Sequence, residues 1–161
     1  MTAAELKKHL DAADKSPKQV AAAVAGLPEK TLRYKPSPGK WCIQEIVGHL
    51  ADIEIVYAHR FRQMLADSSP VIAPMDQDAW AQNLGYIDTS LPEMVAAYGL
   101  NRHSTLQLLR RMKPGDLERS AYHPELKRAV TVAEYVEKMS GHGENHLGQI
   151  ERLKKETAAK K

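Results

Sequence analysis

The sequence predicts an all-α protein, a four-helix bundle in a single domain. Its 161 residues suit one domain. Three long segments repeat apolar residues at spacings of three and four, which is the period of an amphipathic helix, and the chain shows little strand pattern. Long amphipathic helices bury their apolar faces most simply against one another. We therefore expect one domain over residues 1–161, with short helices in residues 1–34 and the bundle core over about 38–155.

The N-terminal part predicts short helices because punctuating residues interrupt it. Ser16 and Pro17 make a favourable N-cap and first-turn pair for a helix that ends near Gly26. Residues 27–34 fit one more turn. Two prolines and a glycine then predict a loop over residues 35–40.

Two further long helices follow this loop. The segment 41–67 carries an apolar stripe, formed by Ile43, Val47, Leu50, Ile53, Tyr57, Phe61 and Met64. A short helix that stops at Gly85 fits the segment after it. The residues SLPE, at 90–93, form a capping-box motif that opens a third long helix through Leu109 or Met112.

The C-terminal part predicts an irregular connection and then the last long helix. Residues 118–129 lack helical periodicity, and a short hairpin is one form they could take. The residues TVAE, at 131–134, form a second capping-box motif, which opens a helix to about Lys155. The connections are long enough that a simple up-down-up-down order is not required.

Composition argues against several classes of partner. The net charge is +3, but the basic residues are scattered and aromatic residues make up only 6%, so we expect no nucleic-acid partner. No apolar run reaches the length of a membrane span, and the polar N-terminus lacks the apolar region of a signal peptide. Cys42 is the one cysteine, which excludes an internal disulfide and fits a reducing cytoplasm. We expect a cytoplasmic protein with no membrane partner.

Two histidines interrupt the apolar stripe of the last helix. His142 and His146, in the stretch HGENH, fall near the centre of that stripe on a helical wheel. Burying two imidazoles on adjacent turns costs free energy unless their nitrogens find partners. A metal ion bound by both rings would supply the partner, because residues four apart face the same side. Satisfied core histidines remain the alternative.

His49 is the best candidate for a third metal ligand. It lies midway along the helix 41–67, at the edge of the apolar stripe and roughly 90° from its centre. Cys42, Val56 and Arg60 share its line on that helix and could form a pocket wall. A half-exposed surface histidine is the alternative for His49 alone.

Other polar residues receive narrower predictions. Arg102 lies on the apolar stripe of the third helix, so it either pairs with a carboxylate, with Asp52 or Glu45 as candidates, or binds an anionic ligand. His123 could reach the metal site from its connection or be solvated. Glu144 lies about 200° from His142 on the wheel, so the stretch does not match the HExxH motif of zincins, where the glutamate follows the first histidine directly.

Three segments resemble the DinB superfamily of helical proteins, which is related to bacterial thiol-dependent transferases. The segments are PGKWCIQEIVGHLADIE, DQDAW and TVAEYVEKMSGHGENHLGQIERL, and the resemblance covers about residues 38–155. It implies an up-down-down-up four-helix bundle, often dimeric. It also implies one divalent metal ion, zinc or nickel, held by histidines that match His49, His142 and His146. Asn145 stands where family members often have another histidine.

The resemblance leaves the reaction open. Characterised relatives use the metal to activate a low-molecular-weight thiol such as bacillithiol or mycothiol. We therefore expect a metal-dependent enzyme, a thiol-dependent S-transferase or a hydrolase, that acts as a homodimer on a small electrophile. The alternatives are a non-catalytic metal-stabilised bundle, serving as a ligand-binding or stress-response module, and a metal-free interaction protein. No catalytic acid or base stands out. The residues expected to line the pocket or to support the metal ligands are Arg102, Asn145, His123 and Asp52.

Overall fold

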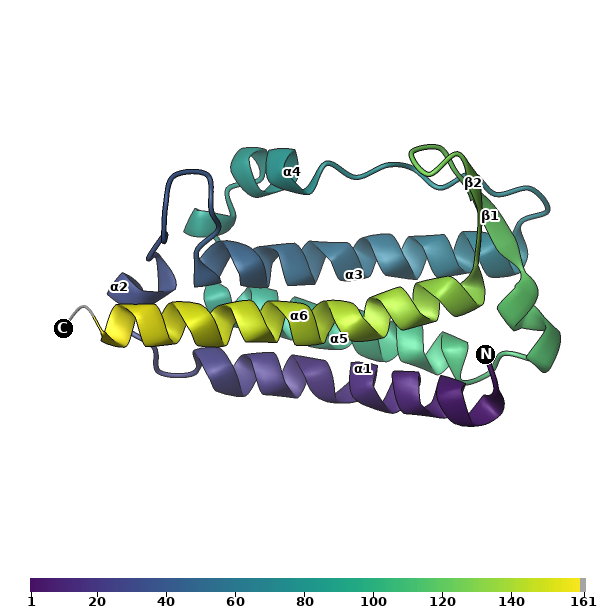
Figure 1. Cartoon of the computed structure of the whole chain (residues 1–161), viewed down its shortest axis with the longest axis horizontal. Helices are drawn as coiled ribbons and strands as arrows, with labels where there is room; N and C mark the ends of the chain where they lie inside the picture. Colours follow the sequence, from purple (N-terminus) through teal and green to yellow (C-terminus); the bar gives the residue numbers. More distant parts are fainter. Residues whose placement is uncertain (160–161) are drawn as a thin grey trace.

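The computed structural model describes residues 1–159 and contains the four long helices of a bundle (Figure 1). These are α1 (Ala3–Val24), α3 (Ile43–Ala66), α5 (Leu91–Leu109) and α6 (Val132–Ala158). Helices α1 and α6 run in one direction, and α3 and α5 run in the other. The predicted all-α four-helix bundle and its up-down-down-up order are therefore confirmed.

Short elements fill the connections between the long helices. They are α2 (Glu29–Leu32), α4 (Gln77–Asn83), the 3-10 helices η1 (Tyr86–Asp88) and η2 (Pro114–Glu118), and the strands β1 (Ser120–His123) and β2 (Arg128–Thr131). The two strands form an antiparallel hairpin, the form considered for the irregular connection. Figure 1 shows α4 and this hairpin on the same side of the bundle, above α3.

Helix α1 corrects the prediction of short N-terminal helices within residues 1–34. It is a continuous helix of 22 residues, with Pro17 inside it and Ser16 buried rather than capping a helix. Proline has no N–H to donate to the carbonyl four residues earlier, that of Ala13. Arg102 of α5 donates to this carbonyl instead, with Nη1 at 3.0 Å from the oxygen. The helix therefore continues through the proline and becomes a full member of the bundle.

Two glycines allow neighbouring elements to approach the bundle closely. A Cβ added at Gly48 of α3 would lie 2.5 Å from the ring of Tyr86, so the glycine makes room for η1. A Cβ added at Gly143 of α6 would collide with the hydroxyl of Ser16 on α1, which shares a 2.7 Å hydrogen bond with the hydroxyl of Tyr98. Gly143 therefore allows α1 and α6 to pack closely against each other.

A layer of buried polar groups divides the apolar core. One apolar cluster lies toward the hairpin end of the bundle, and the other lies toward the α2 end. Along α5 the boundary falls at Arg102, and along α6 it falls at His142 and His146. The candidate functional residues therefore occupy the middle of the bundle.

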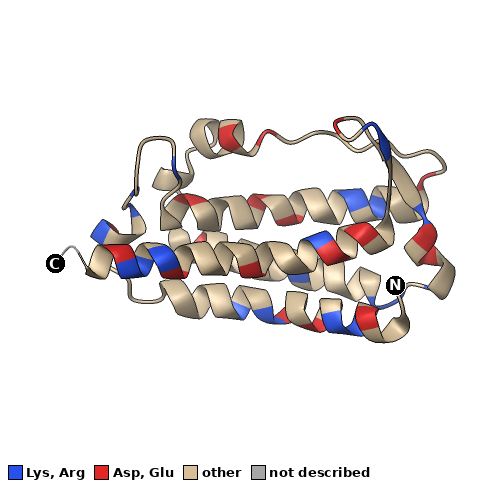
Figure 2. Ribbon diagram, in the orientation of Figure 1, with Lys and Arg blue, Asp and Glu red and all other residues tan. Residues whose placement is uncertain are grey.

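The surface of the bundle carries both signs of charge. Figure 2 shows basic and acidic residues interspersed along the long helices. Within residues 1–159, no helix is long and apolar enough to cross a membrane.

Candidate metal centre

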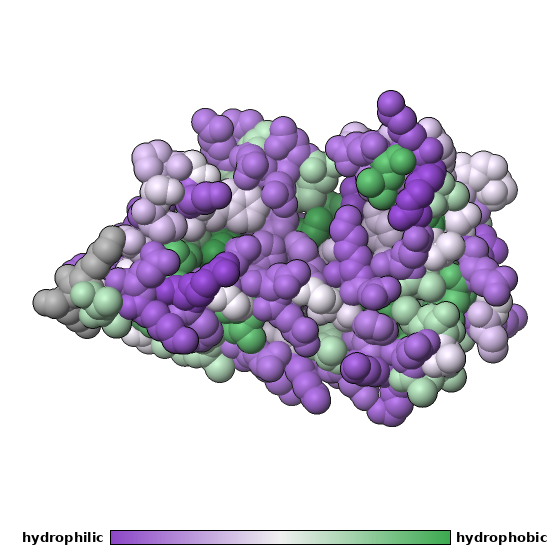
Figure 3. Space-filling model, in the orientation of Figure 1, coloured by the Kyte–Doolittle hydropathy of each residue, from purple (hydrophilic) through white to green (hydrophobic). Residues whose placement is uncertain are grey.

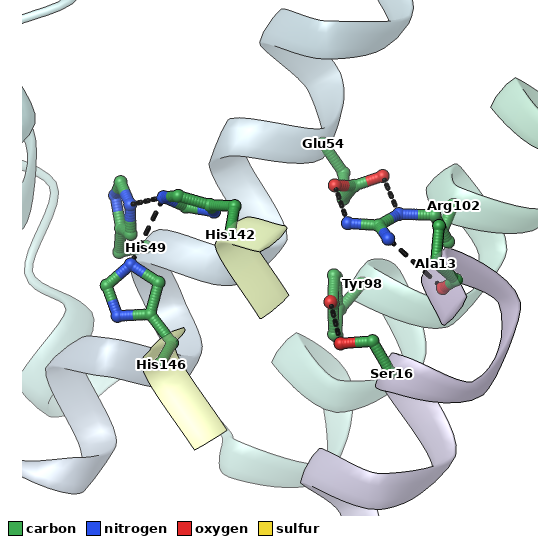
Figure 4. Close-up of polar contacts among 8 residues, drawn as sticks. All are labelled: Ala13, Ser16, His49, Glu54, Tyr98, Arg102, His142 and His146. Atoms are coloured by element: carbon green, nitrogen blue, oxygen red, sulfur yellow. Dashed lines mark hydrogen bonds and ion pairs between the residues drawn. The ribbon is translucent and has the colours of Figure 1, made fainter. Parts of the chain in front are cut away.

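The structure brings together the three histidines that the sequence singled out. Nε2 of His142 lies 3.2 Å from Nε2 of His49 and 3.1 Å from Nε2 of His146 (Figure 4). Two nitrogens bound at about 2.0–2.1 Å to one ion lie roughly 3 Å apart, at angles between octahedral and tetrahedral. Helices α3 and α6 thus place Nε2 of His142 at metal-ligand spacing from the other two, and the three ligand atoms all lie within 4.8 Å of one another.

Burial keeps these imidazoles neutral. His49 is 1% exposed and His146 is 7% exposed. Burial, followed by the proximity of His146, lowers the pKa of His49 to about 3. Burial, followed by the neighbouring His146 and His49, lowers the pKa of His142 to about 2, and burial also lowers the pKa of His146. A neutral imidazole offers the lone pair that a metal ion binds.

The half-exposed alternative for His49 is therefore excluded. The helical wheel correctly placed this residue at the edge of the stripe of α3, but it could not show which element covers that edge. The ring of Trp41 covers it, with ring centroids 4.9 Å apart. Helix α6 contributes the other neighbours, since the rings of His142 and His146 lie 5.1 and 4.9 Å from that of His49.

Gln149 fixes the orientation of one imidazole, a role that the sequence reasoning missed. Nδ1 of His146 lies 3.0 Å from Oε1 of Gln149, three residues further along α6. An amide oxygen only accepts, so Nδ1 carries the proton and Nε2 presents its lone pair to the centre. The spacing of three residues on a helix was the signal that could have identified this pair. Nδ1 of His49 and of His142 is buried without a partner in the described part of the chain.

Aromatic rings surround the three imidazoles. The Trp41 ring is nearly parallel to that of His146, at 6.3 Å between centroids, and the Tyr57 ring lies edge-on to His142 at 6.0 Å. Within residues 1–159, no carboxylate forms a hydrogen bond with any of the three histidines. A divalent ion held here would keep its full charge.

An open cavity adjoins the centre on the side of His146. Its volume is about 580 Å³, within the range of small-molecule sites. His146, Trp41 and Gln149 form part of its wall, and the exposed side chains of Lys40 and Arg152 also line it. Small molecules can therefore reach one of the three histidines from solvent.

Arg102 pairs with a carboxylate, as expected, but with a different partner. Its Nε and Nη2 lie 2.7 and 2.6 Å from the two carboxylate oxygens of Glu54 (Figure 4). The predicted partners Asp52 and Glu45 are wrong, because Asp52 accepts from the hydroxyl of Tyr86 and Glu45 binds a lysine of the preceding loop. Asp52 precedes Glu54 by two residues, which places it about 200° away around the helix. Of these two carboxylates, only Glu54 therefore faces α5.

The four residues expected to line the pocket or to support the metal ligands do not bond to the three imidazoles. Within the described chain, Arg102, Asp52, His123 and Asn145 make no hydrogen bond to them. Asn145 is exposed on α6, and His123 is buried at the end of β1. Glu144 is exposed and outside the centre, as its position on the wheel predicted.

Comparison with known proteins identifies the family. The family model described as the DinB superfamily matches residues 12–150. The chain belongs to the DinB superfamily. The match begins inside α1, so this DinB protein uses its N-terminal helix as part of the family fold.

Similar proteins carry metal-dependent descriptions. The DinB chain is 28% identical over 140 residues to a "putative metal-dependent hydrolase" of Oceanobacillus iheyensis, covering 85% of this chain and 78% of the relative. It is 26% identical over 147 residues to YfiT of Bacillus subtilis, with the same description, covering 91% and 82%. The descriptions and the three-histidine cluster together suggest a divalent metal ion for this protein.

A solved structure has the same fold. The structure of YfiT from Bacillus subtilis is described as that of "a probable metal-dependent hydrolase with an unusual four-helix bundle topology". It superposes with a TM-score of 0.93 at 22% identity, covering 98% of this chain and 90% of YfiT. This likeness supports the bundle topology assigned to the DinB protein.

Proposed function

We propose that His49, His142 and His146 hold one divalent metal ion, and that the protein is a metal-dependent enzyme for small molecules. The observation that carries the proposal is the convergence of the Nε2 atoms of two buried histidines and the half-buried His142, at 3.1 and 3.2 Å, beside an open cavity. Core histidines without a metal would leave these nitrogens facing one another. The facing nitrogens carry too few protons for a hydrogen bond in both pairs, because Nε2 of His146 carries a lone pair and no proton.

The proposed reaction is hydrolysis or thiol transfer. A divalent ion with three neutral histidine ligands supplies Lewis acidity and makes a water or thiol more acidic. The protein contributes the cavity, the aromatic walls formed by Trp41 and Tyr57, and the orientation imposed by Gln149. Hydrolysis is the activity named for the relatives, and thiol transfer is the one implied by the wider family resemblance. Zinc or nickel, a homodimer and a cytoplasmic location stay predictions.

A non-catalytic, metal-stabilised bundle is the second candidate. The observation in its favour is that no acidic or basic residue of the described chain forms a hydrogen bond to the three imidazoles other than the imidazoles themselves. Many metal enzymes place a general acid or base near the metal. In this alternative, metal binding raises stability while the cavity binds a ligand without transforming it.

Metal binding by variants tests the ligand assignment. We expect one equivalent of Zn²⁺ or Ni²⁺ per chain after equilibrium dialysis of untagged protein. His49→Ala, His142→Ala and His146→Ala should each lose affinity by more than the roughly 10–100-fold that loss of an outer-shell partner costs. The control is His103→Ala, which removes an exposed histidine of α5. Stoichiometric metal in His49→Ala, at the affinity of the control, would contradict the assignment.

Cobalt substitution separates the enzyme from the structural alternative. A catalytic site keeps an open coordination position, whereas a structural site is closed by four protein ligands. If the site is open, adding a small thiol to Co²⁺-loaded protein should produce a sulfur-to-cobalt charge-transfer band. The band should be absent in His146→Ala. A spectrum that does not respond to thiols or to other small ligands favours the structural role. If the spectrum does respond, activity is then assayed with sets of esters and of electrophiles.

A further inference from the structure

Arg60 is a buried arginine without an acidic partner. It is 6% exposed, and no carboxylate of the described chain lies within ion-pair distance. Nη2 donates to the carbonyl oxygen of Ala73 at 2.6 Å, and Nη1 donates to the hydroxyl of Tyr135 at 3.4 Å. Nε is buried and has no acceptor among residues 1–159. A buried arginine is rarely left without an anion, and Arg102 in the same bundle has its carboxylate.

Lys138 lies with Arg60 around the ring of Tyr135, and His123 is near enough to both for their charges to lower its pKa. The Lys138 ammonium is 5.6 Å from the ring centroid, and the guanidinium carbon of Arg60 is 5.8 Å from it. His123, at the end of β1, is 4% exposed, and its Nδ1 has no partner in the part of the chain that the structure describes. We call Arg60, His123, Tyr135 and Lys138 the cationic cluster.

The positive charges of the cluster lower the pKa values of their basic neighbours. Partial burial and the charge of Arg60 lower the pKa of Lys138. Burial, then Arg60 and Lys138, lower the pKa of His123. Glu125 opposes these effects, but it is exposed in the hairpin turn and makes no ion pair with the cluster. Two cationic side chains and a histidine therefore lie near one exposed carboxylate, which leaves an excess of positive charge, as in sites that attract anions.

Arg60 of α3 and Lys138 of α6 lie on the same two helices as the three-histidine centre, and His123 comes from β1. Lys138 precedes His142 by four residues on α6, which is about 6 Å along the axis, and Tyr135 precedes it by seven residues, about 10 Å. Tyr57 connects the two sites, with its ring 6.0 Å from that of His142 and 6.2 Å from that of Tyr135. Figure 3 shows this face of the molecule hollowed between the part that carries α4 and the hairpin.

We propose that Arg60, His123 and Lys138 form a subsite that binds the oxyanion of the molecule transformed at the three-histidine centre. The inference rests on the proposed function for the reacting end, and it adds the substrate class: a small molecule with a carboxylate or phosphate about 6–10 Å from its reacting atom. Nε of Arg60 and the Lys138 ammonium supply donors for charge-assisted hydrogen bonds. A neutral His123 can add Nδ1–H as a third donor.

A purely structural role for Arg60 predicts different behaviour. In that case the guanidinium only attaches the loop at Ala73 to α3, and Lys138 has no part in it. Lys138 is exposed and forms no ion pair in the described chain, so its replacement should not disturb folding. Lys138→Met therefore tests the subsite without unfolding the protein. The matched control is Lys155→Met, which removes an exposed lysine near the far end of α6 and so changes the net charge equally.

The experiment titrates inorganic phosphate and, separately, succinate into metal-free and metal-loaded protein. Two-dimensional NMR follows the backbone amides around the cluster and the ring of His123. Wild type and Lys155→Met should bind at least one anion with equal affinity, and Lys138→Met should bind it about tenfold or more weakly. Arg60→Gln should lose binding further, with its circular dichroism spectrum as the check on folding. A preference for succinate identifies a carboxylate ligand, and a preference for phosphate identifies a phosphate ligand.

The outcomes separate this inference from the proposed function. No binding of either anion to wild type, or equal affinity in Lys138→Met and Lys155→Met, would overturn the subsite even if the metal binds. Anion binding to the cluster in a chain that fails to bind metal would retain an anion site and reject the metal-dependent enzyme.

Discussion

Acid should destabilise the metal-free protein through its buried histidines. Burial lowers the pKa of His49 to about 3 and that of His142 to about 2, whereas an unfolded histidine has a pKa of about 6.5. Below pH 6.5 the unfolded chain therefore binds protons that the folded chain does not. Stability falls as the pH drops from 6.5 toward the folded values, because the unfolded state binds more protons.

The pKa values set the size of this loss. One pKa unit corresponds to about 1.4 kcal/mol. Between pH 6.5 and pH 5, about 1.5 units, both folded histidines stay neutral, so each contributes a loss of about 2 kcal/mol. Together His49 and His142 should lower the free energy of unfolding by about 4 kcal/mol, a large part of a typical domain's stability.

Urea unfolding at pH 7 and pH 5 measures the loss. The protein is first stripped of metal with a chelator. The double variant His49→Asn/His142→Asn should lose less free energy than wild type over this interval, by about 4 kcal/mol. The control His59→Asn/His103→Asn removes two exposed histidines and should behave like wild type. Equal losses in wild type and in the His49/His142 variant would refute the idea that these imidazoles are held neutral by burial.

Three further substitutions test separate contacts. Gly143→Ala should cost about 1–3 kcal/mol in urea unfolding, because a methyl group overpacks the contact with α1, and an unchanged midpoint would contradict that contact. Glu54→Leu should cost about 3–5 kcal/mol by the same measurement, because Arg102 keeps a buried charge without its carboxylate, and a loss within error of zero would contradict this account. Gln149→Leu should weaken metal binding about 10–100-fold in competition with a chelating indicator, because His146 loses the acceptor that fixes its tautomer, and unchanged affinity would argue against that role.

The sequence predicted the helices whose signals are local. An apolar stripe and a capping box are written in consecutive residues, so the predicted helix 41–67 appears as Ile43–Ala66. The capping box at 131–134 begins α6, with Thr131 accepting from the backbone N–H of Glu134. The wheel also placed His142 and His146 on one face, because that placement needs only the helical period.

Long-range contacts decided what the sequence could not. The residues around Pro17 predict a helix start, yet α1 continues through them. A guanidinium from α5 donates a hydrogen bond to the carbonyl oxygen that the proline leaves without a donor. The partner of Arg102 was misassigned for a related reason, since a wheel gives the face of each residue but not the facing helix. The cationic cluster was equally hidden, because Arg60, His123 and Lys138 come from three elements. Only their packing shows that, among residues 1–159, no carboxylate forms an ion pair with them and that the exposed Glu125 is an acidic neighbour.

The position of the three histidines in the core argues that they are kept for a ligand. They lie with the Arg102–Glu54 pair in the layer that divides two apolar clusters. Replacing a buried ion pair by apolar side chains of similar volume often leaves a protein equally stable or makes it more stable. The paired arginine is satisfied within the chain, but Nδ1 of His49 and of His142 is not, and three Nε2 atoms face one another. Unpartnered buried nitrogens do not stabilise the folded chain by themselves. A bound divalent ion would stabilise it, because binding to the folded state alone adds about 2.7 kcal/mol of stability when the free ion is at 100 times its dissociation constant.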